Sequence, residues 1–391
     1  DQRRTQVIRP QNPLLLAGAS LIGAGTLIRE AGQVGYTNYL IDCEPEIWKK
    51  ADKFVLLSGY LHRWLLGFFC DSLSNQAGHI PFDSKRQKWA DWRDVKYHVY
   101  PVEPEKRVPL VPSGTVMGNL SAAAQADTGL SAKVQVIAAA PDKACETLGT
   151  GCADDTEAVL SFGSQATVQT ISRKYYELQQ FVPSFPAATP GCWSPELQVY
   201  RGYWMIQWFL KEMENAGVQE QEHPEDTFDT YLRKTPAGND GLVMYPYMGA
   251  SAKYPRSSGT IMGLRDYHGK AHLYRAMIEG INYTLRWAVE RMETLKKSPV
   301  QTMKVTGGGS SSDTICQLTA DMFGRPAVRM ETADTTSLGA AIVGYTALGV
   351  HKDYTSAVQS MTKIEKTFLP DPQNTALYNT LYDAYQKDLE K

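Results

Sequence analysis

A run of three glycines and three serines lies where a strand-like pattern changes to a helix-like pattern. Glycines 307–309 and serines 310–312 follow a β-branched run that ends at Thr306 and precede a helical pattern from Asp313. Glycine lets a backbone approach a ligand closely, and N–H groups at a helix start attract anions. Serine and aspartate can cap the helix or bind a ribose or base. A nucleotide loop and a plain capped turn explain these residues equally well, although neither a Walker loop nor a dinucleotide fingerprint is present.

Two further segments carry residue types that could act on a phosphoryl group. Asp142 stands at the end of a short apolar strand and opens a helix of small residues. Such an aspartate is either a helix cap, which is the commoner role, or a catalytic base. Gly163 and Ser164 form a tight turn, whose N–H groups are functional only if a phosphate lies against them.

Strands and helices alternate along the part of the chain that holds these residues, which predicts an α/β fold. We expect a strand at 134–140, a turn at 141–142 and a hairpin centred on 163–164. A long amphipathic helix is expected over 269–295, because its apolar residues recur at helical spacing. Similar spacing between residues 45 and 67 predicts another helix. The expected elements around the glycine run are a strand up to Thr306, a helix after it and a last small-residue helix at 335–349.

The segment "GTIMGLRDYHGKAHLYRAMIEGIN", residues 259–282, supplies a more specific pattern. Its order of glycine, apolar, alanine and acid–glycine positions resembles the second signature of the FGGY carbohydrate kinases. These belong to the superfamily of sugar kinases, actin and heat-shock ATPases. Three other stretches resemble that family in the same order: "PDKACETLGTGC" its base-bearing turn, "LSFGSQAT" its second phosphate loop and "VTGGGSSSD" its adenosine loop. Within the family the chain looks closest to kinases of the ribulokinase and xylulokinase type.

The resemblance implies a two-domain ribonuclease H-like fold, also called the actin-like ATPase fold, with a cleft between the domains. We expect a sugar-binding domain over residues 1–153 and a nucleotide-binding domain over 154–391. Family members open with an aspartate-x-glycine-threonine hairpin that holds phosphates, and nothing before Asp1 supplies it. We therefore expect the N-terminal domain to be incomplete in this sequence because a segment is missing. The alternative is a truncated, non-catalytic nucleotide-binding or scaffold relative.

The resemblance also implies an ATP- and Mg²⁺-dependent transfer of phosphate to a sugar hydroxyl, with a ketopentose such as ribulose or xylulose as the first expectation. Asp142 would be the catalytic base and would reach the metal directly or through water. Besides Asp142, the expected substrate-binding residues are Asp1, Arg3 and Lys143. The expected nucleotide-binding residues are Gly163, Ser164, Gly202, Gln207, Gly308, Gly309 and Ser312.

Composition narrows the class of protein. A formal net charge of −2 argues against nucleic acid or an anionic membrane as the main partner. Six scattered cysteines without a metal-like spacing suit a reducing cytoplasm. The basic, partly apolar start is interrupted by Pro10 and Pro13, so we expect folded sequence and not a signal peptide. A homodimer is the prior expectation, and a nicotinamide dehydrogenase using the glycines at 18–25 is the remaining, weaker alternative.

Overall fold

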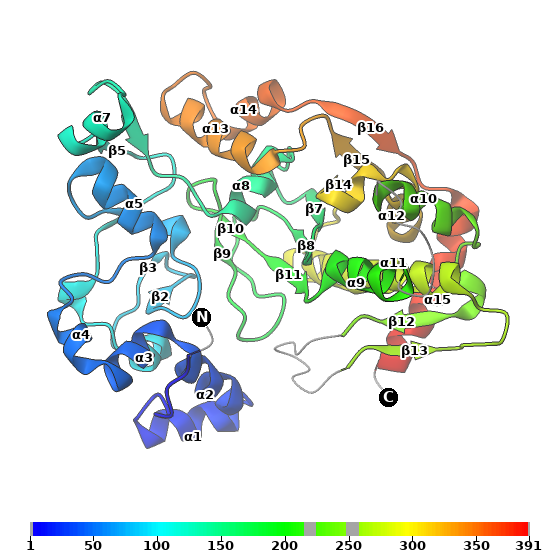
Figure 1. The fold of residues 1–391 in the computed structure, drawn as a ribbon, viewed down its shortest axis with the longest axis horizontal. Helices are drawn as coiled ribbons and strands as arrows, with labels where there is room; N and C mark the ends of the chain where they lie inside the picture. Colours follow the sequence, from blue (N-terminus) through cyan, green and yellow to red (C-terminus); the bar gives the residue numbers. More distant parts are fainter. Residues whose placement is uncertain (1–2, 215–223, 248–257, 390–391) are drawn as a thin grey trace. The chain divides into compact units, whose positions relative to one another are not determined.

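The computed structural model describes residues 3–214, 224–247 and 258–389, and the chain forms two units in it (Figure 1). The first unit consists of Asp1–Cys145, Gln180–Trp193 and Ala340–Tyr354. The second consists of Glu146–Gln179, Ser194–Gly339 and Thr355–Lys391. None of the helices in the described part of the chain combines the length and hydrophobicity needed to cross a bilayer.

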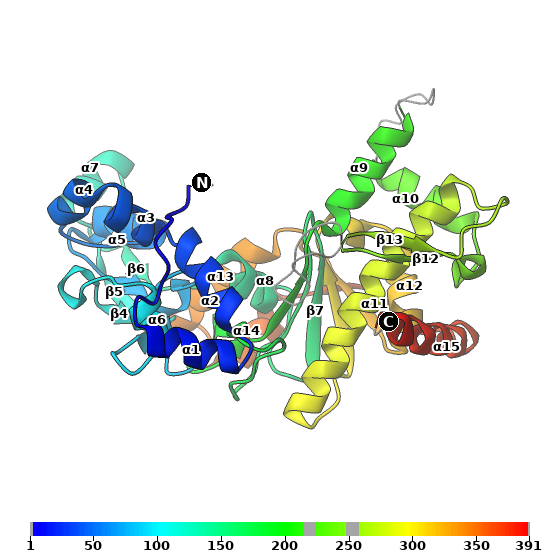
Figure 2. The ribbon, with the colours of Figure 1, turned by 90° about the horizontal axis from the view of Figure 1, so that it is seen from below.

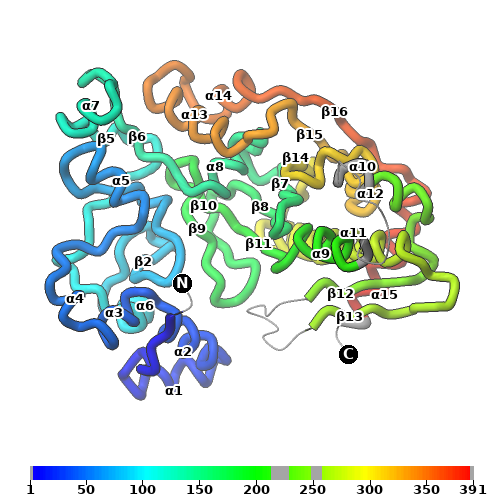
Figure 3. Tube along the Cα trace, viewed as in Figure 1, coloured from blue at the N-terminus to red at the C-terminus, as the bar shows by residue number. Residues whose placement is uncertain are grey.

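A six-stranded sheet in the order β11-β8-β7-β14-β15-β16 organises the second unit. β14 pairs in parallel with β7 and β15, whereas β8, β11 and β16 join by antiparallel pairing. β7 and β8 form the predicted hairpin (Figure 3). Most residues of the central strands are buried, as is typical of strands covered on both faces. The strands are β7 (Glu157–Phe162), β8 (Ala166–Gln169), β11 (Glu196–Val199), β14 (Thr302–Thr306), β15 (Ala327–Met330) and β16 (Ile364–Phe368).

Helix α11 (Lys270–Lys296; Figure 2) is the predicted long amphipathic helix. It packs against β8 and β11. Its apolar face is buried, including Met277, Ile281 and Leu285. A small antiparallel pair, β12 (Val243–Tyr245) and β13 (Thr260–Met262), lies beside it. The other helices with residues in this unit are α8 (Asp142–Gly149), α9 (Gly202–Glu214), α10 (Pro224–Arg233), α12 (Asp313–Phe323), α13 (Thr335–Ala347), α14 (Tyr354–Met361) and α15 (Pro372–Leu389).

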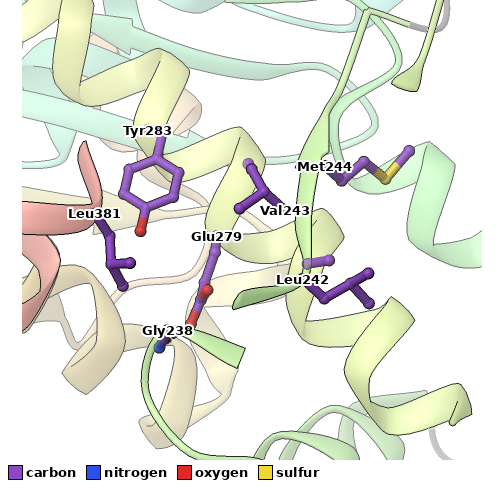
Figure 4. Close-up of a pocket in the computed structure, with 9 residues that line it drawn as sticks. Gly238, Leu242, Val243, Met244, Glu279, Tyr283 and Leu381 are labelled. Carbon is purple, nitrogen blue, oxygen red and sulfur yellow. Dashed lines mark hydrogen bonds between the residues drawn. The ribbon is translucent and has the colours of Figure 1, made fainter. Parts of the chain in front are cut away.

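Glu279 and Gly280, the acid–glycine pair of the resemblance, hold α11 to its neighbours. Tyr378 on α15 donates to Glu279 Oε1 at 2.7 Å, Arg275 lies 3.0 Å away and the Gly238 N–H donates at 3.2 Å. Burial raises the pKa of Glu279 although these partners oppose the shift. A Cβ on Gly280 would lie 2.2 Å from the Met244 carbonyl oxygen, so only glycine permits this approach. Figure 4 shows Glu279 beside the small pocket next to these contacts. The pair therefore has a structural role.

The first unit is built from short helices and two-stranded sheets. The predicted helix between residues 45 and 67 is wrong as a single element, because the structure has α4 and α5 separated by an extended segment. There the Phe54 N–H donates to the Lys106 carbonyl at 2.8 Å, a tertiary contact that outweighs helical spacing. The helices are α1 (Pro13–Leu21), α2 (Gly25–Val34), α3 (Tyr36–Cys43), α4 (Pro45–Lys50), α5 (Leu57–Leu66), α6 (Val95–Val99) and α7 (Ala122–Thr128). The strand pairs are β1 (Asp71–Ser72) with β4 (Leu110–Val111), β2 (Phe82–Asp83) with β3 (Lys88–Trp89), β5 (Val116–Asn119) with β6 (Gln135–Ile137), and β9 (Phe185–Pro186) with β10 (Trp193–Ser194).

Asp71 is a buried carboxylate that joins α5 to β1. It accepts hydrogen bonds from Ser58 at 2.8 Å and Gln76 at 2.9 Å, and His62 Nδ1 lies 3.0 Å from its Oδ1. Burial by itself would raise the pKa of Asp71, but the His62 contact and the hydrogen bonds from Ser58 and Asn75 outweigh it and lower the pKa. Asp71 is thus held in its charged form.

The lowered pKa of Asp71 predicts how the stability of the protein depends on pH. The unfolded chain protonates near the ordinary value of about 3.9, above the folded-state pKa, so the stabilisation is complete at neutral pH and is lost as pH falls through that range. We expect Asp71→Asn to cost about 2 kcal/mol at pH 7 and to flatten the acid limb of a urea-unfolding series. The exposed Asp127→Asn is the control. An unchanged acid limb in Asp71→Asn would contradict the assignment.

Candidate functional site

The glycine loop follows β14, as predicted, and packs against the β7–β8 turn. Gly307 has φ of +83°, and a Cβ there would lie 2.9 Å from the carbonyl carbon of Phe162 and 3.0 Å from Gly163 N. A Cβ on Gly309 would lie 2.4 Å from the ring of Tyr203. Gly308 has nothing within 4 Å of its Cβ position. Two of the three glycines are therefore required by packing within the protein, and Gly308 is the one that adjoins open space.

The β7–β8 turn is held from behind by the first turn of α9. Tyr203 N donates to the Gly163 carbonyl at 3.0 Å, and Trp204 N donates to the Ser164 carbonyl at 3.2 Å. In a trans peptide the next N–H points away from the carbonyl, so the N–H groups of Ser164 and Gln165 are directed away from α9. No described residue accepts a hydrogen bond from either of them. The turn thus presents two oriented donors suited to an anion.

Gly202 and Gln207, the two predicted residues on α9, differ in their surroundings. A Cβ on Gly202 would lie 2.1 Å from Ala166 N, so glycine is needed for α9 to approach the turn. Gln207 lies one and a half turns further on and is exposed. Gly202 therefore shapes the turn through packing.

The serines after the glycines fix the loop by local hydrogen bonds. Ser310 Oγ donates to the Gly307 carbonyl and Ser311 Oγ to the Gly308 carbonyl, each at 2.7 Å. Ser312 is the N-cap of α12: its Oγ accepts from Ile315 N at 3.1 Å and donates to Asp229 on α10 at 2.5 Å. The predicted capping role of the serines is confirmed for Ser312.

Arg329 on β15 stabilises the same loop, a contact that the sequence analysis did not predict. Its Nη1 donates to the carbonyl of Ser310 at 3.0 Å, and its Nη2 lies 2.9 Å from both Asp313 and Glu365. The hydrogen bond from Lys366 is the largest of the interactions that lower the pKa of Asp313, and Arg329 adds to it. Since Arg329 lies 16 residues beyond Asp313, no local spacing signals this contact.

Asp142 opens α8 in the first unit and is exposed. Its Oδ1 accepts from Lys143 N at 2.7 Å, and its Oδ2 has no partner among the described residues. One turn later, Glu146 Oε1 accepts from Ser161 Oγ on β7 at 3.0 Å, and Thr147 donates to Gln169 on β8 at 2.9 Å. The helix is therefore anchored at its second turn, and the carboxylate at its start keeps an oxygen open to solvent.

The remaining predicted residues belong to the first unit as well. Asp1 lies outside the described residues. Arg3 is exposed: its Nη1 lies 3.4 Å from Glu44 Oε1, and its guanidinium stands 4.8 Å from the ring centre of Tyr39. Lys143 is half-buried. In the described ranges, no cluster of three or more His, Cys, Asp or Glu side chains could hold a metal ion by itself.

Comparisons with known proteins identify the family. The model of the N-terminal domain of the FGGY family of carbohydrate kinases matches residues 27–149, and that of the C-terminal domain matches 158–348. The uncharacterized sugar kinase YgcE of Escherichia coli K12 is 28% identical over 85% of this chain and 69% of its own length. The xylulose kinase of Lactococcus lactis is 25% identical over 89% of this chain and 69% of its own length.

Solved structures agree on the fold. The gluconate kinase of Lactobacillus acidophilus superposes with a TM-score of 0.81 at 22% identity, over 96% of this chain and 76% of that one. The xylulose kinase of the same organism gives 0.79, with the same identity and coverage. The predicted fold class, the mixed α/β, two-domain actin-like ATPase fold, is confirmed. Because the two family models together span most of the sequence, the chain belongs to the FGGY family of carbohydrate kinases and is a sugar phosphotransferase.

Proposed function

We propose that the protein transfers the γ-phosphate of ATP to a hydroxyl of a ketopentose such as xylulose or ribulose. ATP is the phosphate donor of FGGY kinases. The observation that carries the proposal is the packing of Gly307 against Phe162 and Gly163. This contact brings the glycine loop next to the β7–β8 turn, whose N–H groups at Ser164 and Gln165 have no acceptor among the described residues. We take the two N–H groups of the turn and the open side of Gly308 together as the proposed nucleotide cradle of the second unit.

Nucleotide binding would use this cradle. The N–H groups after Gly163 and Ser164 donate to phosphoryl oxygens, where fixed dipoles need no reorganisation as charge develops. The open side of Gly308 admits the adenosine, with Gly309 and Ser312 holding the loop in shape. The Ser312 hydroxyl is already engaged, because it caps α12 and donates to Asp229. Ser312 therefore contributes by fixing the loop.

Asp142 would act as the general base in the transfer. It accepts the proton of the attacking hydroxyl as that oxygen bonds to the γ-phosphorus in line with the leaving ADP. Its exposed Oδ2 suits this role, since that atom has no partner to displace among the described residues. Lys143, Arg3 and Asp1 are the proposed sugar-binding residues.

Mg²⁺ fits the residues present. It commonly binds through one or two carboxylates together with substrate phosphates and waters, so a cage made only of protein ligands is not required. Asp142 would hold it directly or through water, and bound Mg²⁺ would neutralise charge on the phosphates.

Relatives of modest sequence identity support the proposed sugar class. Four of the similar curated proteins from three genera are xylulose kinases that are 25–28% identical to this chain. The gluconokinase of Bacillus subtilis is 24% identical. The proposed division into a sugar-binding part at 1–153 and a nucleotide-binding part at 154–391 belongs to the same proposal, as does a homodimer, which light scattering would test.

A panel of acceptors tests the function. Coupled ADP-release assays with xylulose, ribulose, gluconate and glycerol should give a kcat/KM for one ketopentose at least about tenfold above that for gluconate. Preference for gluconate would overturn the proposed sugar class but would still support kinase activity. Binding of ATP without turnover on any acceptor would instead favour the non-catalytic alternative.

A further inference from the structure

Arg329 connects the glycine loop to the edge of the six-stranded sheet. Its Nη1 donates to the carbonyl of Ser310 at 3.0 Å and to that of Ser311 at 3.2 Å. Its Nε and Nη2 make a two-point contact with the Glu365 carboxylate at 3.0 and 2.9 Å. Nη2 also lies 2.9 Å from Asp313 Oδ1. An arginine has five N–H donors in a rigid fork, and these contacts account for all of them.

The strands beneath the guanidinium hold it in place. Arg329 lies on β15, and Glu365 lies on the neighbouring strand β16. The arginine side chain is 13% exposed, and its guanidinium stands 5.5 Å from the ring centre of the buried Phe368. A planar fork that meets a carboxylate at two points has a defined orientation, which lysine cannot reproduce. The two loop carbonyls are therefore bonded to a donor whose position the sheet sets.

Gly308 and Ser311 form the part of the loop that packing restrains least. No atom lies within 4 Å of the Cβ position of Gly308, and Ser311 is exposed. Ser311 Oγ donates to the Gly308 carbonyl, a bond that stays within the loop. The Ser310 carbonyl also accepts from Cys316 Sγ at 3.2 Å, but a thiol is a weak donor. Without Arg329 this segment would have to be ordered when a ligand binds, and that ordering would reduce affinity.

We propose that Arg329 is a positioning residue for nucleotide binding: it holds the carbonyls of Ser310 and Ser311 and so orders the glycine loop before an adenosine nucleotide arrives. The inference rests on the proposed function, in which the open side of Gly308 admits the adenosine. Arg329 acts through the loop and donates nothing to the ligand, since its five N–H groups are already engaged. Its loss should weaken nucleotide binding and leave the chemical step unchanged.

Arg329→Lys tests this inference, with Arg325→Lys as the matched control. Lysine keeps the positive charge but cannot span a carboxylate and two carbonyls at once. Arg325 also makes a two-point contact, with Glu293 at 2.7 and 3.1 Å, and lies beyond the end of α12 that is opposite the loop. The full chain is titrated calorimetrically with Mg²⁺ and a non-hydrolysable ATP analogue. Binding should be about tenfold weaker in Arg329→Lys and unchanged in Arg325→Lys.

Kinetics and hydrogen exchange give readouts that a general loss of stability would not move. With the best sugar, the KM for ATP should rise about tenfold in Arg329→Lys, whereas kcat and the KM for the sugar should stay within about twofold of the wild type. Hydrogen exchange at the amides of residues 308–311 should be faster in this variant and slow again when the analogue is bound. Arg325→Lys should show neither change.

The outcomes separate this inference from the function on which it rests. Equal affinity for the analogue in the wild type and Arg329→Lys would overturn the inference but leave the proposed function in place. Equal weakening in both lysine variants would overturn it too, because a general loss of stability would then explain the result. A wild-type chain that binds no analogue would overturn the proposed function and this inference with it.

Glu365→Gln is the second variant and is used if Arg329→Lys does not fold. The neutral amide weakens one side of the two-point contact while Arg329 stays in the chain. Binding of the analogue should be about threefold weaker than in the wild type. Unchanged binding in this variant would likewise overturn the inference.

Discussion

Replacing Asp142 with asparagine is expected to lower kcat by about 10²–10⁴-fold, because the attacking hydroxyl would lose the acceptor of its proton. The change keeps the size and the Oδ1 acceptor for Lys143 N, so the fold should be retained. Binding of ATP to the cradle in the second unit should change little. Steady-state kinetics with the best sugar, together with nucleotide titration, separate the two effects.

Asp91→Asn is the matched control for this prediction. Asp91 is also a partly exposed aspartate of the first unit whose Oδ1 accepts a nearby N–H, that of Arg93 at 3.0 Å. Its removal should leave kcat within about twofold of the wild type, because no chemistry is assigned to it. If Asp142→Asn kept full turnover, or lost nucleotide binding as well as turnover, Asp142 would not be the base.

Gly149→Ala is expected to lower the free energy of unfolding by more than about 4 kcal/mol. A Cβ at this position in α8 would lie 1.8 Å from the Thr335 carbonyl oxygen and 2.6 Å from Gly339 N, both on α13. These neighbours are backbone atoms, so the helices would have to separate to accept a methyl group. Urea unfolding followed by circular dichroism measures the loss.

Gly344→Ala in the interior of α13 provides the comparison. No atom lies within 4 Å of its Cβ position, and alanine favours the helix over glycine. We expect a stability equal to that of the wild type or up to about 1 kcal/mol higher. Equal losses in the Gly149 and Gly344 variants would show that the close approach of α8 and α13 does not govern stability.

Local sequence patterns predicted the main strands and helices of the second unit. The hairpin around Gly163, the helix after Lys270 and the strand–loop–helix at 302–323 were each recognised from periodicity and turn residues. These signals depend on neighbours within a few residues. The helix predicted across residues 45–67 was wrong because the Lys106 carbonyl, some 50 residues further along the chain, takes the Phe54 N–H.

The structural roles of the site residues were harder to predict than their positions in the chain. Sequence indicated that glycines 307–309 clear space for a ligand, whereas the structure assigns 307 and 309 to packing on Phe162 and Tyr203. Arg329 and the buried Asp71 were missed, since their partners come from other strands and helices. The roles of Asp142, Arg3 and the nucleotide-binding residues in binding and catalysis remain predictions.

The bonds from α9 to the β7–β8 turn have a consequence for how the protein attracts phosphate. Tyr203 and Trp204 align two peptide groups of the turn with the axis of a 13-residue helix, so the turn continues the row of backbone dipoles. A phosphoryl group at Ser164 N–H and Gln165 N–H would then meet the positive end of that row. Because these two N–H groups are held by the backbone, a phosphoryl group that binds them orders no side chain, whereas a flexible lysine would lose rotamer freedom on binding.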